Sequence, residues 1–402
     1  MRKKTFVAAA ALCAVLAGGT IHAAEPLKPD TVFNRIMGLW QKHDLDAPFQ
    51  SAEPLGDDGI VFRGIDITEG GNFSLKTDTV SIAGLAPLGS DGFSAERLEI
   101  GPVAIDIDGG EGKVFAVRIE PSEGTGLYLA PTGSDDLHIS KTLPTAFKLG
   151  KLTATLDGRE FLVLAGFETT AWFDETGELL TMKSSLPDLS IAMDNAPAEV
   201  RSRMAMLGLT NIAMAFRSSG SWNIATGRMT LDEHAIELKD AGTLTLSMEL
   251  TGYTMDVYRR IRQASQTAEK AEPGNADAQM QAMAQMMSAL GDIKLASAKL
   301  RFRDGALTSR LVAMQAEAMG ATPQEFAASA PAMLDEPLAR LNDPQLAEQV
   351  KTALAQFLAD PDELTLDFAP ASPVPVAEIF EATLNAPEKL RPLLGLNLTA
   401  SR

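Results

Sequence analysis

Apolar and polar residues alternate with a period of two through most of residues 59–253. The clearest example is the segment TLTLSMEL at residues 243–250, in which every second residue is apolar. This alternation is typical of an antiparallel strand that buries one face and exposes the other. We therefore expect one set of side chains to face inward (Leu244, Leu246, Met248 and Leu250) and the other to face outward (Thr243, Thr245, Ser247 and Glu249).

Turn residues separate the alternating segments at short intervals. A glycine follows an acidic residue in residues 57–59, 69–72, 91–92, 108–110 and 157–158. Such dipeptides are favoured in tight hairpin turns, because glycine tolerates the left-handed backbone that these turns need. The spacing predicts a β-meander or a large curved sheet.

A short motif occurs twice: WFDETG at residues 172–177 and WNIATG at residues 222–227. Both copies are expected to end a strand and enter a hairpin turn, with Thr-Gly in the turn. Two interpretations stay open, namely a duplicated β-unit and two independent uses of a common hairpin sequence.

Helical spacing predicts helices in three places before the C-terminal region. Residues 30–44 form one amphipathic pattern, and residues 196–207 form another, which Gly208 ends. The buried stripe of the second would be Val200, Met204 and Leu207. Residues 256–292 are rich in Ala, Gln and Met, and the breaker at residues 272–275 predicts two helices with a flexible middle.

Residues 293–402 predict a strand, two helices, a strand, a helix and a strand, in this order. Thr322 to Glu325 combines a capping box with proline at the first helical position, and Asp343-Pro344 begins the next helix. The last helix is expected at residues 376–389. We therefore predict an α+β fold, in which a large curved antiparallel sheet (a meander) carries a helical C-terminal region. Its parts would be a β-rich domain with an N-terminal helix (24–255), a helical linker (256–292) and the C-terminal region (293–402).

The N-terminus has the three parts of a cleavable signal peptide. Arg2, Lys3 and Lys4 are followed by the apolar residues 6–17 and by a small-residue cleavage site at residues 21–23. A lipoprotein signal around Cys13 is the alternative, but Leu12 stands where a small residue would be needed. Residues 1–23 would be removed, which leaves a soluble chain without cysteine. A bacterial periplasm is the expected location, and full secretion stays open.

Charge limits the partners that we expect. The chain has 402 residues and a formal net charge of −18, and removal of residues 1–23 makes the charge more negative. Nucleic acids and anionic lipid surfaces attract basic proteins, so neither is an expected partner. No later segment is long and apolar enough for a membrane span, so none is expected in the mature chain.

The sequence contains no recognisable catalytic, cofactor-binding or metal-binding motif. His43, His138 and His234 are far apart and lack a second ligand at metal-binding spacing. Residues 106–111 resemble the start of a calcium loop, but Val117 stands where the loop needs a glutamate. Phosphate-binding, dinucleotide-binding and serine-hydrolase signatures are also missing. We therefore expect a protein that is not an enzyme and uses no cofactor or metal.

Met280, Met283, Met286 and Met287 form an unusual cluster with helical spacing. Methionine fills irregular apolar space, so core or groove packing is the favoured interpretation. A flexible apolar contact surface is the second interpretation. A copper(I) site is the third, because thioethers are soft ligands.

Several segments together resemble a known group of proteins. They are residues 221–231, 240–254, 300–307, 357–361 and 373–376. They resemble an uncharacterised family of exported alphaproteobacterial proteins, and the architecture is loosely similar to YdgA-like and AsmA-like envelope proteins. The resemblance is best over residues 210–402. It implies a curved sheet with an apolar concave face that can hold lipid, and it transfers no catalytic residue.

These observations predict a periplasmic binding protein for an apolar or amphiphilic, lipid-like ligand. The alternative is a structural protein that binds another envelope protein through an edge strand or a helix. A large apolar groove would favour the first hypothesis, and a filled core with an exposed patch would favour the second.

Overall fold

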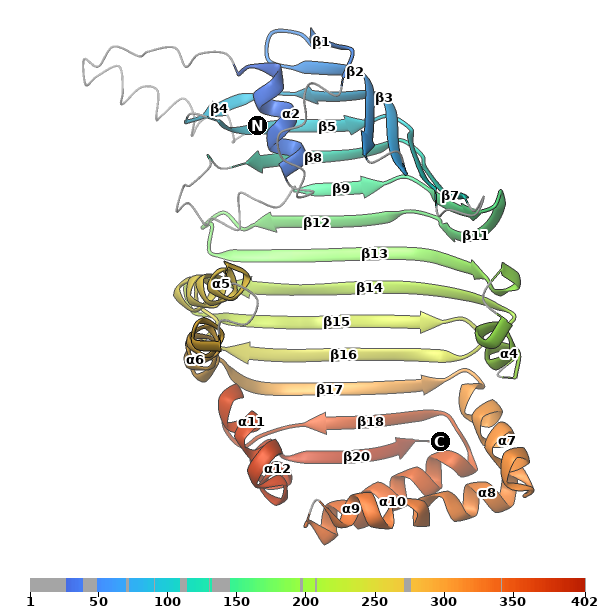
Figure 1. Ribbon diagram of the computed structural model, residues 1–402. Coiled ribbons are helices and arrows are strands. Elements are labelled where there is room, and N and C mark those ends of the chain that lie inside the picture. Colours follow the sequence, from blue (N-terminus) through green and yellow to red (C-terminus); the bar gives the residue numbers. More distant parts are fainter. Residues whose placement is uncertain are drawn as a thin grey trace.

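The computed structural model describes residues 27–38, 49–69, 72–89, 91–108, 114–129, 131, 145–195, 198–206, 208–270, 276–340 and 342–401. These residues form one antiparallel sheet of 20 strands, with one helix packed over its first strands and the other helices along its margins (Figure 1). This confirms the predicted α+β fold with a helical C-terminal region. The predicted signal peptide lies outside the described residues.

The strands follow the alternating segments of the sequence. They are β1 (Ser51–Pro54), β2 (Ile60–Glu69), β3 (Phe73–Ala83), β4 (Ala86–Leu88), β5 (Gly92–Ile100), β6 (Val103–Asp108), β7 (Val114–Ile119), β8 (Ser122–Leu129), β9 (Ala146–Leu149), β10 (Leu152–Leu156), β11 (Arg159–Leu164), β12 (Phe167–Phe173), β13 (Leu179–Ala192), β14 (Asn211–Asn223), β15 (Arg228–Leu238), β16 (Gly242–Thr251), β17 (Lys294–Asp304), β18 (Glu363–Phe368), β19 (Val374–Pro375) and β20 (Leu396–Ser401).

In the described part of the sequence, one helix precedes the first strand and the other helices lie between strands. They are α2 (Pro29–Gly38), α4 (Ala198–Met206), α5 (Met255–Lys270), α6 (Ala276–Asp292), α7 (Leu307–Met319), α8 (Pro323–Ser329), α9 (Asp335–Ala339), α10 (Pro344–Ala359), α11 (Val376–Asn385) and α12 (Leu390–Leu394), with the short 3-10 turns η1 (Met193–Asn195), η2 (Ala330–Leu334) and η3 (Pro387–Lys389).

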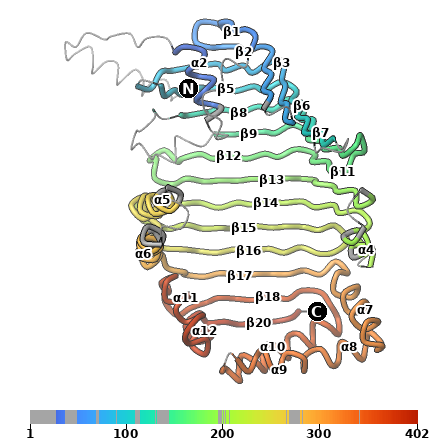
Figure 2. Tube along the Cα trace, in the orientation of Figure 1, coloured from blue at the N-terminus to red at the C-terminus, as the bar shows by residue number. Residues whose placement is uncertain are grey.

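The first half of the sheet divides into two branches. One half of β3 pairs with β5 and the other with β6. One branch continues through β8, β9 and β12, the other through β7, β10 and β11, and both rejoin on β13. The second branch turns away from the first in Figure 2. Glycine or proline lies between the consecutive strands of these branches, at residues 101–102, 121, 150 and 166. Both residue types are unfavourable inside a regular strand, so they end one strand before the next begins.

The largest cluster of fully buried side chains lies beneath α2. Val32 and Phe33 of this helix pack with Phe62, Ile82 and Phe93 of the sheet. Phe33, Phe49 and Phe62 form an aromatic triad with ring centroids 5.1–5.4 Å apart. The predicted helix at residues 30–44 is thus described only to Gly38, and its remainder lies outside the described residues.

The second half of the sheet is a meander from β13 to β17, extended by β18 and β20. The Ala/Gln/Met-rich segment forms α5 and α6 between the neighbouring strands β16 and β17. The sheet is therefore continuous across this segment, and the division into separate parts stays a prediction.

The C-terminal region contains the predicted order of elements and three additional α-helices, α7, α9 and α12. Thr322 and Glu325 form the predicted capping box at α8, and Asp343 caps α10. The longest helix missed by the sequence pattern is α7, which follows a turn held by Asp304. Its carboxylate accepts hydrogen bonds from the backbone N–H groups of Ala306 and Thr308.

Candidate functional site: an open apolar face of the central sheet

One side of β13–β18 and β20 carries an apolar surface, which we call the apolar face. Residues directly opposite each other across strands share a side, and successive residues alternate. Two rows of the face run across the strands: Leu186, Phe216, Ile236, Leu244, Phe302 and Leu364, and then Met182, Gly220, Leu231, Met248, Ala298 and Phe368.

The opposite side, which we call the polar face, carries cross-strand ion pairs. Arg228 meets Glu249 at 2.8 Å, and Lys299 meets Asp367 at 3.0 Å. The hydrogen bond from Arg228 lowers the pKa of Glu249. Exposed pairs of this kind keep the polar face in water and contribute little to stability.

Helices cover the two ends of the apolar face. At one end, the Trp222 ring lies 5.2 Å from that of Tyr253 and 6.0 Å from that of Tyr258 in α5. At β17, Phe302 packs against Phe357 of α10 with a centroid separation of 6.1 Å. Figure 1 shows α5 and α6 at one end of β14–β17, and α4 and α7 at the other.

Between these helices the apolar face is open. Ile236 and Leu244, opposite each other on β15 and β16, are 38% and 42% exposed. Leu246, Met248 and Leu250 are half-buried. The alternation with a period of two and the common side of these four residues were predicted correctly. The expectation that Leu244 faces a closed core is wrong. Local alternation specifies the side of a strand, whereas the element that covers this side is far away in the sequence.

A third row of the apolar face, between the other two, changes from polar to apolar across the sheet. It runs from β12 to β20 through Thr169, Ser184, Ser218, His234, Leu246, Leu300, Leu366 and Leu398. The Thr169 and Ser184 hydroxyls are 3.0 Å apart, and His234 Nδ1 lies 3.4 Å from Ser218 Oγ. The His234 ring also meets Phe216 edge-on at 5.0 Å. All four polar side chains of the row are half-buried.

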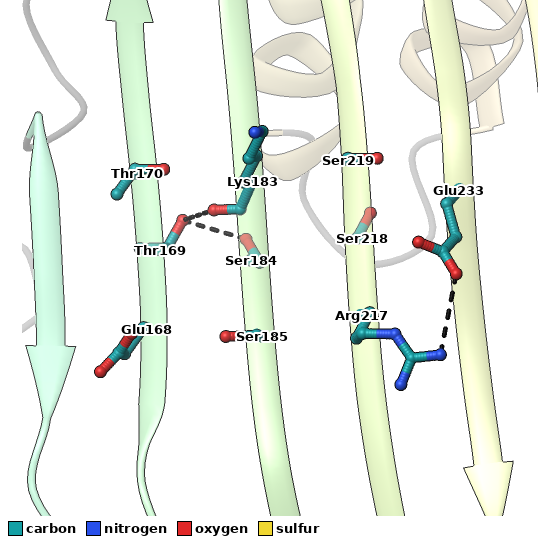
Figure 3. A pocket seen from close by; sticks show the side chains of 10 residues that line it. All are labelled: Glu168, Thr169, Thr170, Lys183, Ser184, Ser185, Arg217, Ser218, Ser219 and Glu233. Atoms are coloured by element: carbon teal, nitrogen blue, oxygen red, sulfur yellow. Dashed lines mark hydrogen bonds and ion pairs between the residues drawn. The ribbon is translucent and has the colours of Figure 1, made fainter.

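A shallow hollow of about 410 Å³ lies on the same strands and is lined by residues assigned to both faces (Figure 3). Its long side chains are Glu168, Lys183, Arg217 and Glu233, and its small ones are Thr169, Thr170, Ser184, Ser185, Ser218 and Ser219. Arg217 reaches toward Glu233 at 3.8 Å. The Lys183 ammonium lies 5.7 Å from the Trp172 ring centroid, a cation–π contact.

The two tryptophan motifs are both hairpins, as predicted. In one turn the Asp174 carboxylate accepts from the Thr176 hydroxyl, and in the other the Asn223 carbonyl accepts from that of Thr226. Their tryptophans lie on opposite sides of the sheet, because Trp172 lies opposite Thr181 whereas Trp222 lies opposite Leu180. Trp172 is 41% exposed and Trp222 is buried. Whether the motif is a duplication stays open.

The methionine cluster lies on the outer side of α6. Met280, Met283 and Met287 are exposed, and Met286 is half-buried. The helix instead buries Ala289, close to Val257 and Ile293. The sequence favoured core or groove packing; core packing is therefore wrong for the three exposed methionines, and groove packing stays a prediction. An apolar contact surface and a copper site stay open.

The remaining candidates lie partly outside the described residues. His43 and His138 lie outside the described residues, and so do residues 109–113 of the calcium-like segment. Within the described ranges no group of three His, Cys, Asp or Glu side chains has the arrangement of a metal site. Among the helices of the described segments, none is long and apolar enough to cross a membrane.

A single-layer antiparallel sheet with an open, graded apolar face is the class of structure that these observations define. A family model described as "Uncharacterized protein" matches residues 235–401, from within β15 to the end of β20. The match includes the apolar half of the graded row, from Leu246 to Leu398. No curated protein matches the chain.

Sequence reasoning missed the polar half of this row. The signal would have been serine or threonine at apolar positions of an alternating strand, as at Ser184 and Ser218. It could be recognised only once the strand register was known, because the two residues are 34 positions apart in the sequence.

Proposed function

We propose that this chain is a non-catalytic binding protein that holds an amphiphilic, lipid-like ligand against the apolar face. The observation that carries the proposal is the exposure of Ile236 and Leu244 in the middle of that face. Apolar side chains exposed together are costly in water, and they are characteristic of surfaces that bind an apolar partner. The signal-like N-terminus places the protein in the periplasm under this proposal. The resemblance to exported alphaproteobacterial and AsmA-like proteins supports the same function.

An amphiphile fits the face better than a wholly apolar ligand does. The row from Thr169 to Leu398 offers hydrogen-bonding groups at one end and leucine side chains at the other. A ligand without polar groups would leave the hydroxyls of Ser184 and Ser218 covered without additional partners, which is unfavourable.

Native mass spectrometry of the protein purified from its own periplasm tests the proposal. We expect a bound species in the lipid mass range that is released by collisional activation. The double substitution Ile236→Asp and Leu244→Asp should remove it, because each carboxylate would have to be desolvated beneath an acyl chain. Thr245→Asp on the polar face is the matched control and should retain it. A wild-type protein without any bound amphiphile would contradict the proposal.

Binding of another envelope protein is the second candidate function. It is favoured by exposed apolar side chains on α6 and α11, which contact each other: Met280, Met283, Phe380 and Leu384. The same mass spectra distinguish the two functions, since a protein partner would add a mass of many kilodaltons. That partner should be lost when Phe380 and Leu384 are replaced by serine.

A further inference from the structure

We infer that the ligand is a single-chain amphiphile with an uncharged, hydroxylated headgroup, and that it lies across the strands in one direction. Its headgroup would occupy the row of Thr169, Ser184 and Ser218, and its chain would run from His234 over Leu246 toward β17. This inference rests on the proposed function and adds the orientation and the headgroup class.

The polar half of the row is a built hydrogen-bonding surface. Thr169 Oγ1 also donates to the Lys183 carbonyl oxygen at 3.2 Å, besides its contact with Ser184. Ser218 faces Ser184 on one side and His234 on the other. Four adjacent strands thus present hydroxyl or imidazole groups on a side that is otherwise apolar.

The chemistry of these groups favours an uncharged headgroup with hydroxyls. A serine or threonine hydroxyl both donates and accepts hydrogen bonds, as a sugar or glycerol hydroxyl does. The neighbouring charged residues, Lys183, Arg217 and Glu233, occupy the alternate positions of these strands, so they belong to the polar face and not to the hydroxyl row. An anionic headgroup would also meet a chain with a net charge of −18.

The open part of the face limits the length of the chain. Neighbouring strands are about 4.8 Å apart, so the three spacings from β14 to β17 measure about 14 Å. At β17 the open surface ends, because Phe357 of α10 covers Phe302. An extended dodecyl chain has about this length. It would contact Leu246 and Leu300 of the row, with Ile236 and Leu244 beside them.

Three probes with the same dodecyl chain isolate the contribution of the headgroup. They are dodecyl maltoside, dodecanoate and dodecyltrimethylammonium, each titrated into the full chain below its critical micelle concentration by isothermal titration calorimetry. We expect the maltoside to bind at least about tenfold more tightly than either ion, because only its hydroxyls match the row without the burial of a charge.

Matched triple variants assign the effect to one face. Thr169→Val, Ser184→Ala and Ser218→Ala together remove the hydroxyl row, and we expect them to weaken maltoside binding about tenfold without a change for the two ions. Thr170→Val, Ser185→Ala and Ser219→Ala change the next residue on the same three strands, on the polar face. This control should bind all three probes as the wild type does, and circular dichroism checks that both variants are folded.

The outcomes separate the inference from the proposed function. If no probe binds, the proposed function fails and the headgroup inference fails with it. If all three probes bind equally, or if both triple variants lose the same affinity, the headgroup inference is overturned while binding on the apolar face stands. Tighter binding of dodecanoate would overturn the uncharged class in favour of an anionic one.

Discussion

His234 and Leu246 lie directly opposite each other across β15 and β16, and the apolar face changes character between them. On the side of His234 the row continues through Ser218, Ser184 and Thr169. On the side of Leu246 it continues through Leu300, Leu366 and Leu398. The strand register therefore gives the row a polar end and an apolar end, which is the property that binding of an amphiphile requires.

Because the apolar face is open, the free energy of unfolding that a Leu→Ala substitution removes should depend on where the leucine lies on that face. Leu180→Ala removes a side chain that is 1% exposed, and we expect it to lower the free energy of unfolding by about 2–5 kcal/mol. Leu246→Ala should cost less, about 1 kcal/mol, because Leu246 is only half-buried. Thr245→Ala on the polar face should cost under about 1 kcal/mol. Chemical denaturation measures all three, and a loss at Leu246 as large as at Leu180 would show that the face is covered.

Asp343 should make the stability of the C-terminal region depend on pH. Hydrogen bonds from the backbone N–H of Leu346 and from Arg391 hold the pKa of this buried carboxyl below its usual value. A lowered folded pKa means that the stabilisation is complete at neutral pH, begins to fade below about pH 4, and is lost as the pH falls through the folded pKa.

Substitutions at Asp343 separate capping from charge. Asp343→Ala should cost about 1 kcal/mol at neutral pH, because α10 loses its N-terminal cap. Asp343→Asn keeps an acceptor for the cap and should lose the pH dependence. Glu336→Gln, which removes an exposed ion pair with Arg340, is the control and should change little. Equal acid sensitivity of the wild type and Asp343→Asn in denaturation curves would refute this role.

The methionine cluster should not bind copper(I). Thioethers are suitable ligands, but Met280 and Met283 are 64% and 70% exposed, and within the described residues no group of three His, Cys, Asp or Glu side chains forms a metal site. Titration of copper(I) under reducing conditions should show no tight uptake by the wild type or by the variant with leucine at positions 280, 283, 286 and 287. Tight uptake by the wild type that the leucine variant lacks would establish a copper site.

Export predicts a defined mature N-terminus. If residues 1–23 are a signal peptide, the periplasmic protein should begin at or near Ala24. Intact-mass measurement of that fraction gives the answer directly. A chain that keeps residues 1–23, or that carries an acyl group on Cys13, would place the protein at the membrane instead.

The sequence predicts the elements of this fold better than it predicts their surroundings. Alternation and turn glycines located the strand Gly242–Thr251, and capping residues located α8 and α10, because these signals are local. The openness of the face at Leu244 and the row joining Thr169 to His234 depend on pairing between distant segments. The exposure of Met280, Met283 and Met287 contradicts core packing, because α6 buries Ala289 beside Val257 instead, whereas the apolar contact surface that the sequence also suggested stays a prediction.

Quenching of an introduced tryptophan by a brominated ligand tests the central claim most directly. Leu244→Trp places the reporter on the apolar face, and Thr245→Trp places it one residue away on the polar face. Titration of each variant with dibromododecyl maltoside below its critical micelle concentration should quench the added fluorescence at position 244 and leave that at position 245 unchanged. Equal quenching at both positions, or quenching at neither, would contradict binding of an amphiphile on the apolar face.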